Sequence, residues 1–121
     1  MEIDMNYWVV GATWGSDNLA DRFYLRGCWE MGWEEGDKAT YERRVNNIKA
    51  GDRVAIKKMD GHGATTICII AIGVVKDVDG GKVYIDWLVK NMDRHVPCKN
   101  YFGTIHGPVE DDLWRNSAFC L

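Results

Sequence analysis

The stretch TTICIIAIGVVKDVDGGKVYIDWLV, residues 65–89, decides the fold that we predict for this chain. Residues 65–77 are rich in β-branched side chains and apolar enough to form a strand in the middle of a sheet. Asp79-Gly80-Gly81 is typical of a hairpin turn. Residues 82–89 alternate between apolar and polar side chains in their first part, as a half-buried strand does. This stretch therefore predicts an antiparallel β-hairpin at the centre of a sheet.

Strands and short helices are expected on both sides of this hairpin. The segments, in order, are a strand at 6–12, a helix at 18–25 capped by Ser16 or Asp17 and ended by Gly27, a helix at 38–49 stopped by Gly51, a strand at 53–58, a strand at 100–105 and a closing strand or helix at 110–121. In the second helix Tyr41, Val45 and Ile48 form one apolar stripe. A strand, two helices and then a run of strands indicate a small α+β domain around a curled sheet or open barrel.

Length, charge and cysteine usage narrow the class of protein. The chain has 121 residues, enough for one domain, and a formal net charge of -3, which argues against binding through bulk nucleic-acid electrostatics. Its longest apolar run, Ile67–Val75, has the length of a strand, so no membrane span or signal peptide is expected. None of the four cysteines forms a CxxC pair, which favours a cytoplasmic protein with reduced thiols.

The motifs of common catalytic and cofactor sites are missing. The chain has no phosphate-binding GxxxxGK[ST] loop, no GxGxxG and no GxSxG. His62, His95 and His106 stand in loop-like stretches without a paired acid or nucleophile. His95-Val-Pro-Cys98 could be half of a metal site, but no second pair has matching spacing. We therefore expect no enzyme, no cofactor and no metal.

Tryptophans beside glycines are the strongest functional signal. Trp29 and Trp33 lie four residues apart in Gly27–Trp33, and Trp14 follows the first predicted strand. Such tryptophans are more easily explained as walls of a pocket for a flat ligand than as core. Trp8 and Trp87 lie within predicted strands, and we expect them in the core.

Five stretches match, in order, the elements of a known superfamily. They are NYWVVGA (6–12), GCW (27–29), IKAGDRVAIK (48–57), AIGVV (71–75) and VYIDW (83–87). Together they resemble the EVE domains of the PUA-like superfamily, whose relatives include the YTH and ASCH domains. Within it, Arg22-Phe23, Gly27–Trp33 and Gly51–Lys57 resemble the ordered motifs of the EVE-like N-terminal domain of McrB-type restriction proteins. The resemblance covers roughly residues 6–88, and the C-terminal third matches poorly.

This resemblance implies a PUA-like curled sheet or open barrel of about five to six strands flanked by short helices. Residues 1–121 would be one EVE-like domain, either stand-alone or the N-terminal part of a longer McrB-like protein. Its implied function is to recognise a modified, methylated base in double-stranded DNA by flipping the base into an aromatic cage. Implied partners are an AAA+ GTPase motor in the same polypeptide and a nuclease.

The resemblance also assigns site residues. Trp29 would stack on the flipped base, with Trp14 and Trp33 as further walls and Thr13 lining the pocket. The carboxylates of Glu30 and Asp86 would accept hydrogen bonds from an exocyclic amine of the base. For the tryptophans the alternative is a place in the core, and for Asp86 it is a backbone hydrogen bond at a strand edge.

Basic residues gather near the second predicted helix. Arg43, Arg44, Lys57 and Lys58 are the candidates for phosphate contacts, and the alternative is an ordinary solvated surface. Three other functions stay open: a YTH-type reader of modified RNA, a module that binds a nucleotide or other small molecule, and an enzyme that acts on nucleic acid. The motif order favours DNA.

Overall fold

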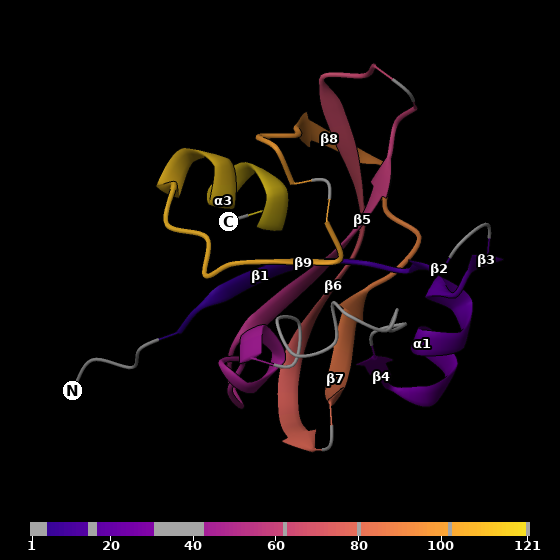
Figure 1. The fold of residues 1–121 in the computed structure, drawn as a ribbon, viewed down its shortest axis with the longest axis vertical. Coiled ribbons are helices and arrows are strands. Elements are labelled where there is room, and N and C mark those ends of the chain that lie inside the picture. Colours follow the sequence, from indigo (N-terminus) through magenta and orange to yellow (C-terminus); the bar gives the residue numbers. More distant parts are fainter. Residues whose placement is uncertain are drawn as a thin grey trace.

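The computed structural model describes residues 5–14, 17–30, 43–61, 63–79, 81–101 and 103–120, without the side chains of residues 13, 14 and 17. Its centre is a curled seven-stranded sheet in the order β4-β7-β6-β5-β1-β9, with β8 paired to β6 off this path (Figure 1). The strands are β1 (Tyr7–Gly11), β2 (Thr13–Trp14), β3 (Asp17–Asn18), β4 (Cys28–Glu30), β5 (Arg53–Met59), β6 (Thr66–Asp79), β7 (Lys82–Val89), β8 (Arg94–Pro97) and β9 (Ile105–His106). The helices are α1 (Ala20–Arg26) and α3 (Asp112–Phe119), and residues 43–46 are also helical. This confirms a curled-sheet α+β fold.

The hairpin predicted from residues 65–89 is the middle of this sheet. β6 pairs antiparallel with β7 from Asp79 opposite Lys82 to Ile72 opposite Val89. On its other edge β6 pairs with β5, and its first residues also pair with β8. Gly73 lies where β6 and β7 are in close contact, since a Cβ there would come within 2.3 Å of Ile85 Cγ2. Glycine at this point lets the sheet bend without a clash.

The Gly51-Asp52 turn ties the start of β5 to two other strands. The backbone N–H of Gly51 donates to Val75 O at 2.8 Å. The Asp52 carboxylate is 1% exposed and accepts from Trp8 Nε1, Lys49 N and Asn6 N at 2.9, 3.0 and 3.1 Å. A buried carboxylate needs such donors. The turn therefore fixes β1 and β5 side by side, where they pair in parallel.

The two faces of the sheet carry separate hydrophobic cores. Side chains alternate along β1, so Trp8 and Val10 enter one core and Val9 enters the other. The α1-side core includes Trp8, Phe23, Trp29, Val45, Ile48, Ile56, Val83 and Ile85. The α3-side core includes Val9, Ala55, Ile67, Ile69, Val96, Trp114, Ala118 and Phe119. Trp8 is buried as expected, and Trp87 is partly buried against the α1-side core.

Most of the predicted elements are present, with shifts at their ends. Gly27 ends α1 in the left-handed conformation, with φ of 64°, as expected. The N-cap of α1 is Leu19, and the Asn18 side chain, in place of Ser16 or Asp17, accepts from Ala20 N. Of the second predicted helix, residues 38–42 lie outside the described residues, and residues 43–46 are helical.

Three segments differ from the prediction. Residues 28–30, which were in none of the predicted strands or helices, form the edge strand β4 and pair with β7. The strand β8 was not foreseen, because only Val96 of its four residues is buried and no alternation is visible. Among the described residues of the strand expected at 100–105, only Ile105 is in a strand, and the closing segment is the helix α3.

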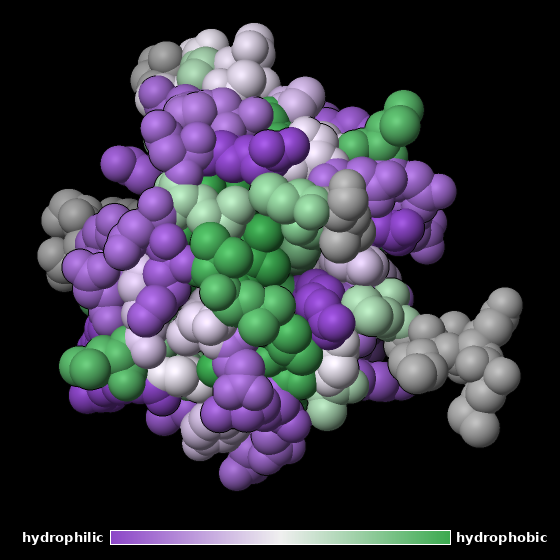
Figure 2. Space-filling model, turned by 180° about the vertical axis from the view of Figure 1, so that it is seen from behind, coloured by the Kyte–Doolittle hydropathy of each residue, from purple (hydrophilic) through white to green (hydrophobic). Residues whose placement is uncertain are grey.

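Hydrophobic side chains also reach the surface. Seen from behind, they form a band across the middle of the molecule, bordered by hydrophilic side chains (Figure 2). Large exposed hydrophobic residues in the described part of the chain include Leu25, Met59, Leu88, Val89 and Leu113. No helix in the described part of the chain is both long and apolar enough to cross a membrane.

Candidate functional site

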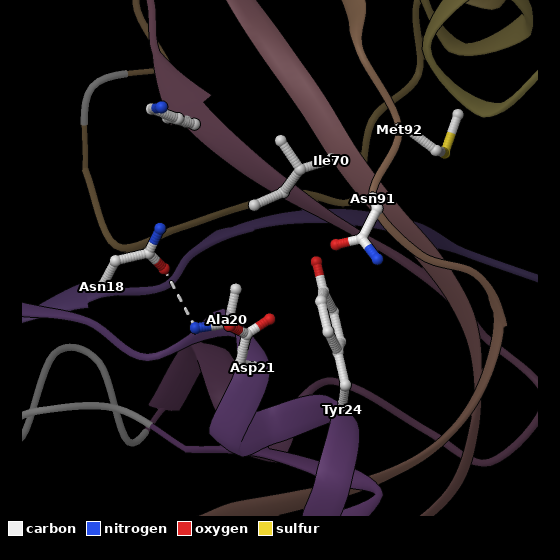
Figure 3. A pocket seen from close by; sticks show the side chains of 8 residues that line it. Asn18, Ala20, Asp21, Tyr24, Ile70, Asn91 and Met92 are labelled. Carbon is white, nitrogen blue, oxygen red and sulfur yellow. Dashed lines mark hydrogen bonds between the residues drawn. The ribbon is translucent and has the colours of Figure 1, made fainter.

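A cavity of about 300 Å³ lies beside the first turns of α1. The residues that line it are Asn18, Ala20, Asp21, Tyr24, Lys58, Ile70, Asn91 and Met92. Figure 3 shows the Tyr24 side chain rising from α1 with its hydroxyl directed at the Asn91 side chain. The wall is mixed, with amides, a carboxylate and a phenol on one part and aliphatic side chains on another. Its volume is at the lower end of the range for small-ligand sites, about 300–1,000 Å³.

The helix wall of the cavity follows from the start of α1. Asn18 is the last residue of β3, and its Oδ1 accepts from the backbone N–H of Ala20 at 3.0 Å. This bond starts the helix and leaves the Asn18 amide nitrogen able to donate to a ligand. Asp21 and Tyr24, three residues apart, share one face of the helix. That face is the wall of the cavity (Figure 3).

The opposite wall depends on an irregularity in the sheet. The pairing of β5 with β6 shifts after Ile56, so that Ala71 and Ile69 have partners in β5 and Ile70 has none. Ile70 packs half-buried against the α1-side core. Its carbonyl accepts from Met92 N at 2.8 Å, which holds the segment after β7 against the cavity. The bulge thereby gives the cavity its aliphatic wall.

Tyr24 is the aromatic side chain of this cavity. Its ring meets Trp87 edge-on, with centroids 5.4 Å apart, and Trp87 Nε1 donates to Phe23 O at 2.9 Å. Burial, and after it the charge of Asp21, raises the pKa of the Tyr24 hydroxyl. The phenol is therefore neutral at physiological pH and can donate a hydrogen bond. A ring held in place beside amide and carboxylate groups suits a flat ligand with a polar edge.

Trp29, expected to stack on a base, lies in the core. It is 0% exposed, and its Nε1 donates to Gly11 O at 2.8 Å. The cause is β4, which pairs with β7 and puts Trp29 opposite Val83 inside the α1-side core. In this conformation no face of the Trp29 indole is open to a ligand.

The two expected carboxylates lie away from the cavity wall. Glu30 is half-buried at the end of β4, between Arg22 and Lys82 at 3.9 and 4.0 Å. Asp86 is exposed and pairs with Lys76 across β6 and β7 at 3.3 Å. Both carboxylates therefore have cationic partners on the protein itself.

The remaining expected pocket residues are described only in part. The backbones of Thr13 and Trp14 form β2, and Thr13 pairs with Asn18 of the cavity wall. Their side chains lie outside the described part of the structure, as does the whole of Trp33.

The four expected phosphate contacts have different surroundings. Lys58 is exposed and lines the cavity. Arg43 is exposed, and Arg44 donates to Ile105 O at 3.0 Å. Lys57 is only 6% exposed, and burial lowers the pKa of its amine. Among the four, Lys57 has the least surface to offer a phosphate.

Several wall residues had no signal in the sequence. The apolar side chains of the first predicted helix are Leu19 and Phe23. Their pattern predicts which face packs against the core, but it does not indicate that Asp21 and Tyr24 on the adjacent face line a cavity. Nothing in the local pattern links Asn91 to α1, because the two are far apart in the sequence and become neighbours only when β7 pairs with β6. Asn18 was the exception, since an asparagine before a helix commonly caps it.

Comparison of the chain with models of known protein families gives no match, and comparison with curated proteins gives none either.

Proposed function

We propose that this chain is a binding module that takes a modified, methylated base of DNA into the cavity beside α1. The observation that carries the proposal is the wall of that cavity, which combines the Tyr24 ring, the amides of Asn18 and Asn91, and the aliphatic Ile70 and Met92. The ordered motifs that resemble EVE-like specificity domains of restriction proteins support the same function.

The energetics of base extrusion agree with such a wall. Flipping a base out of a duplex costs a few kcal/mol, and stacking on an aromatic ring returns about 1–3 kcal/mol per base. One ring, Tyr24, therefore offsets part of the cost. Amide groups on the base edge and aliphatic contacts with a methyl group have to supply the rest.

Discrimination between bases would come from the polar groups. An asparagine amide can both donate to and accept from a base edge, and the Asp21 carboxylate can accept from an exocyclic amine. Methylation adds apolar surface, which Ile70 and Met92 would contact. Lys58 at the same cavity is the cation placed to meet a phosphate of the extruded nucleotide.

The decisive experiment is a binding titration with matched duplexes. The duplexes carry 5-methylcytosine, N6-methyladenine or no modification at one position, and the variant is Asn91→Ala. Asn91 is exposed, and although alanine is less favourable than asparagine at its φ of 57°, a cost of about 1–2 kcal/mol should leave the fold intact. We expect one modified duplex to bind best and Asn91→Ala to weaken that preference by about 1–3 kcal/mol.

Two matched controls separate the cavity from the general surface. Asn116→Ala removes an exposed asparagine from α3, on the other side of the sheet. Lys58→Ala should weaken binding to all duplexes and reduce its salt dependence, whereas Lys76→Ala should change neither. Equal affinity for all three duplexes, unchanged by Asn91→Ala, would contradict the proposal.

The same titration distinguishes the other functions. Preference for a modified base in single-stranded RNA over the duplexes would indicate an RNA reader. Saturable binding of free modified nucleosides without duplex binding would indicate a small-molecule module. In both cases Asn91→Ala reports whether the cavity beside α1 is the site.

A further inference from the structure

Four side chains that can bind metal ions meet where β5, β6 and β8 run side by side. They are Asp60, Cys68, Asp93 and His95. His95 Nδ1 lies 2.7 Å from Asp60 Oδ2, and His95 Nε2 lies 2.8 Å from Asp93 Oδ1. Cys68 Sγ lies 3.5 Å from the same Asp93 oxygen. None of these contacts involves the cavity beside α1.

Sheet pairing brings these residues together. Cys68 lies directly opposite His95 in the β6–β8 pair and opposite Lys58 in the β5–β6 pair. Asp60 follows the end of β5, so it reaches the same place from the other side of β6. The sequence shows no metal motif because the ligands come from three strands and their spacing is set by register.

We propose that Asp60, Cys68 and His95 form a binding site for a divalent transition-metal ion, with Zn²⁺ as the preferred ion. One ligand atom from each of these residues lies within 4.8 Å of the other two. In a tetrahedral zinc site, bonds of about 2.0–2.3 Å place the ligand atoms roughly 3.3–3.7 Å apart. Side-chain movements of about 1–2 Å would therefore bring the three ligand atoms to the separations of a zinc site.

The type of ligand points to zinc. A thiolate and an imidazole select zinc over magnesium or calcium, which prefer sites made of oxygen atoms alone. Three protein ligands leave the fourth position of zinc to water or to a further carboxylate. Without a metal, His95 pairs with the two carboxylates and the Cys68 thiol makes only long contacts, to Asp93 Oδ1 at 3.5 Å and to Ile69 O at 3.8 Å.

Two neighbouring groups would orient the ligands. Thr66 Oγ1 donates to Asp60 Oδ2 at 2.6 Å. With zinc on His95 Nδ1, the Nε2–H would donate to Asp93, which is the carboxylate–histidine–zinc arrangement of many zinc sites. On binding, the Cys68 thiol proton and the proton on His95 Nδ1 pass to solvent, and the ion accepts the lone pairs that they leave.

Metal binding at this site does not require that the chain bind nucleic acid. Two residues of the site lie near cavity residues along the chain, since Asp60 comes two residues after Lys58 and Asp93 comes directly after Met92. A bound ion would hold together the segments that form this part of the cavity wall. Metal binding can nonetheless be measured without any nucleic acid.

The test is a Co²⁺ titration of tag-free, reduced and metal-stripped protein, followed by competition with Zn²⁺. We expect one Co²⁺ per chain, a thiolate-to-cobalt charge-transfer absorption in the near ultraviolet and its loss when Zn²⁺ is added. Zn²⁺ should also raise the Tm of the protein, because it binds the folded state.

Variants then assign the ligands. Cys68→Ser, His95→Gln and Asp60→Asn should each abolish the signal, whereas Asp93→Asn should weaken affinity only about 10–100-fold. Cys98→Ser and Cys120→Ser are the matched controls, since both residues are free cysteines outside the site. Asp60→Asn keeps the size of a side chain that is 17% exposed and keeps an oxygen that can accept from Thr66 Oγ1, so this variant should fold normally. It protects the test if Cys68→Ser is unstable.

Two results would overturn the proposal. One is the absence of Co²⁺ and Zn²⁺ binding in wild-type protein. The other is a thiolate signal that survives Asp60→Asn or is lost in Cys98→Ser.

Discussion

The two faces of the sheet are closed in different ways. On the α3 side, Tyr7 meets Phe119 and Tyr101 meets Trp114 edge-on, with centroids 4.9 and 5.0 Å apart. On the α1 side the core is larger, but the first turns of the short helix α1 lie beside the cavity lined by Tyr24 and Asn91. A hollow of about 350 Å³ also lies at α3, lined by Pro97, Leu113 and Trp114 among others, so the two faces differ in the kind of wall: mainly apolar at α3, but polar groups around a tyrosine ring at α1.

The two faces nevertheless use their buried tryptophans in the same way. Trp29 Nε1 donates to Gly11 O at 2.8 Å on the α1 side, and Trp114 Nε1 donates to Pro97 O at 2.7 Å on the α3 side. Each indole fills a core and satisfies its N–H on backbone. Tryptophan content alone therefore does not identify the face that carries the cavity, because the aromatic side chain of the cavity is a tyrosine.

The largest effect is expected from Trp29→Ala. Removing a fully buried tryptophan should lower the free energy of unfolding by about 3–5 kcal/mol, because it leaves a cavity and an unpaired carbonyl. Chemical denaturation checks this, with Leu25→Ala on the exposed face of α1 as a control near zero. A loss of stability below about 1 kcal/mol would instead indicate that Trp29 is available to a ligand.

Asp52→Ala tests the turn that both faces share. The substitution removes the acceptor of three N–H groups, among them buried Trp8 Nε1, and each unpaired buried donor costs about 1–3 kcal/mol. We expect a loss of about 3 kcal/mol in urea unfolding. Asp86→Ala, which removes an exposed carboxylate, should change stability by less than about 0.5 kcal/mol.

Asp111→Ala tests the α3 face alone. Asp111 caps α3, since its carboxylate accepts from Trp114 N at 3.1 Å, and it also pairs with Lys99. Losing an N-cap costs about 1 kcal/mol. The ligand preference of the cavity should stay the same, because α3 lies on the other face. If nucleic-acid titrations of this variant show an altered preference, the two faces are coupled.

The smallest effect is a pH dependence from His106. Burial, followed by the charges of Lys57 and Arg44, lowers the pKa of His106, and its Nε2 accepts from Gly103 N at 2.8 Å. The folded protein thus disfavours the proton that the unfolded chain binds. The contribution of neutral His106 to the free energy of unfolding is complete above about pH 6.5, the ordinary histidine pKa, and is lost as the pH falls through the lowered pKa.

The measurement is the unfolding free energy of wild type and His106→Gln across this range. Wild type should lose more stability than the variant on acidification. His95, whose pKa is raised by its hydrogen bonds with Asp60 and Asp93, titrates in both proteins. Its contribution to the pH dependence therefore cancels in the difference between the two profiles. Parallel pH profiles would show that His106 is not held neutral.

The strands with strong local patterns were predictable. Residues 82–89 alternate and follow a glycine turn, and β7 has these bounds. Gly27 was placed correctly as the end of α1, because glycine enters the left-handed region without cost. Gly51 does not end the second helix, since its helical residues stop at 46. β8 was not predictable, because its four residues become a strand only through pairing with β6.

By itself the sequence determined the central hairpin, the alternating apolar face of its second strand and the point at which α1 ends. Each of these depends on a local period or on the backbone freedom of one residue. Tertiary structure decided that Trp29 is core, because strand β4 turns its indole inward. It also decided that Tyr24 and Asn91 share a cavity, and that Asp60, Cys68 and His95 meet. Such contacts depend on strand register, which no short stretch of the chain encodes.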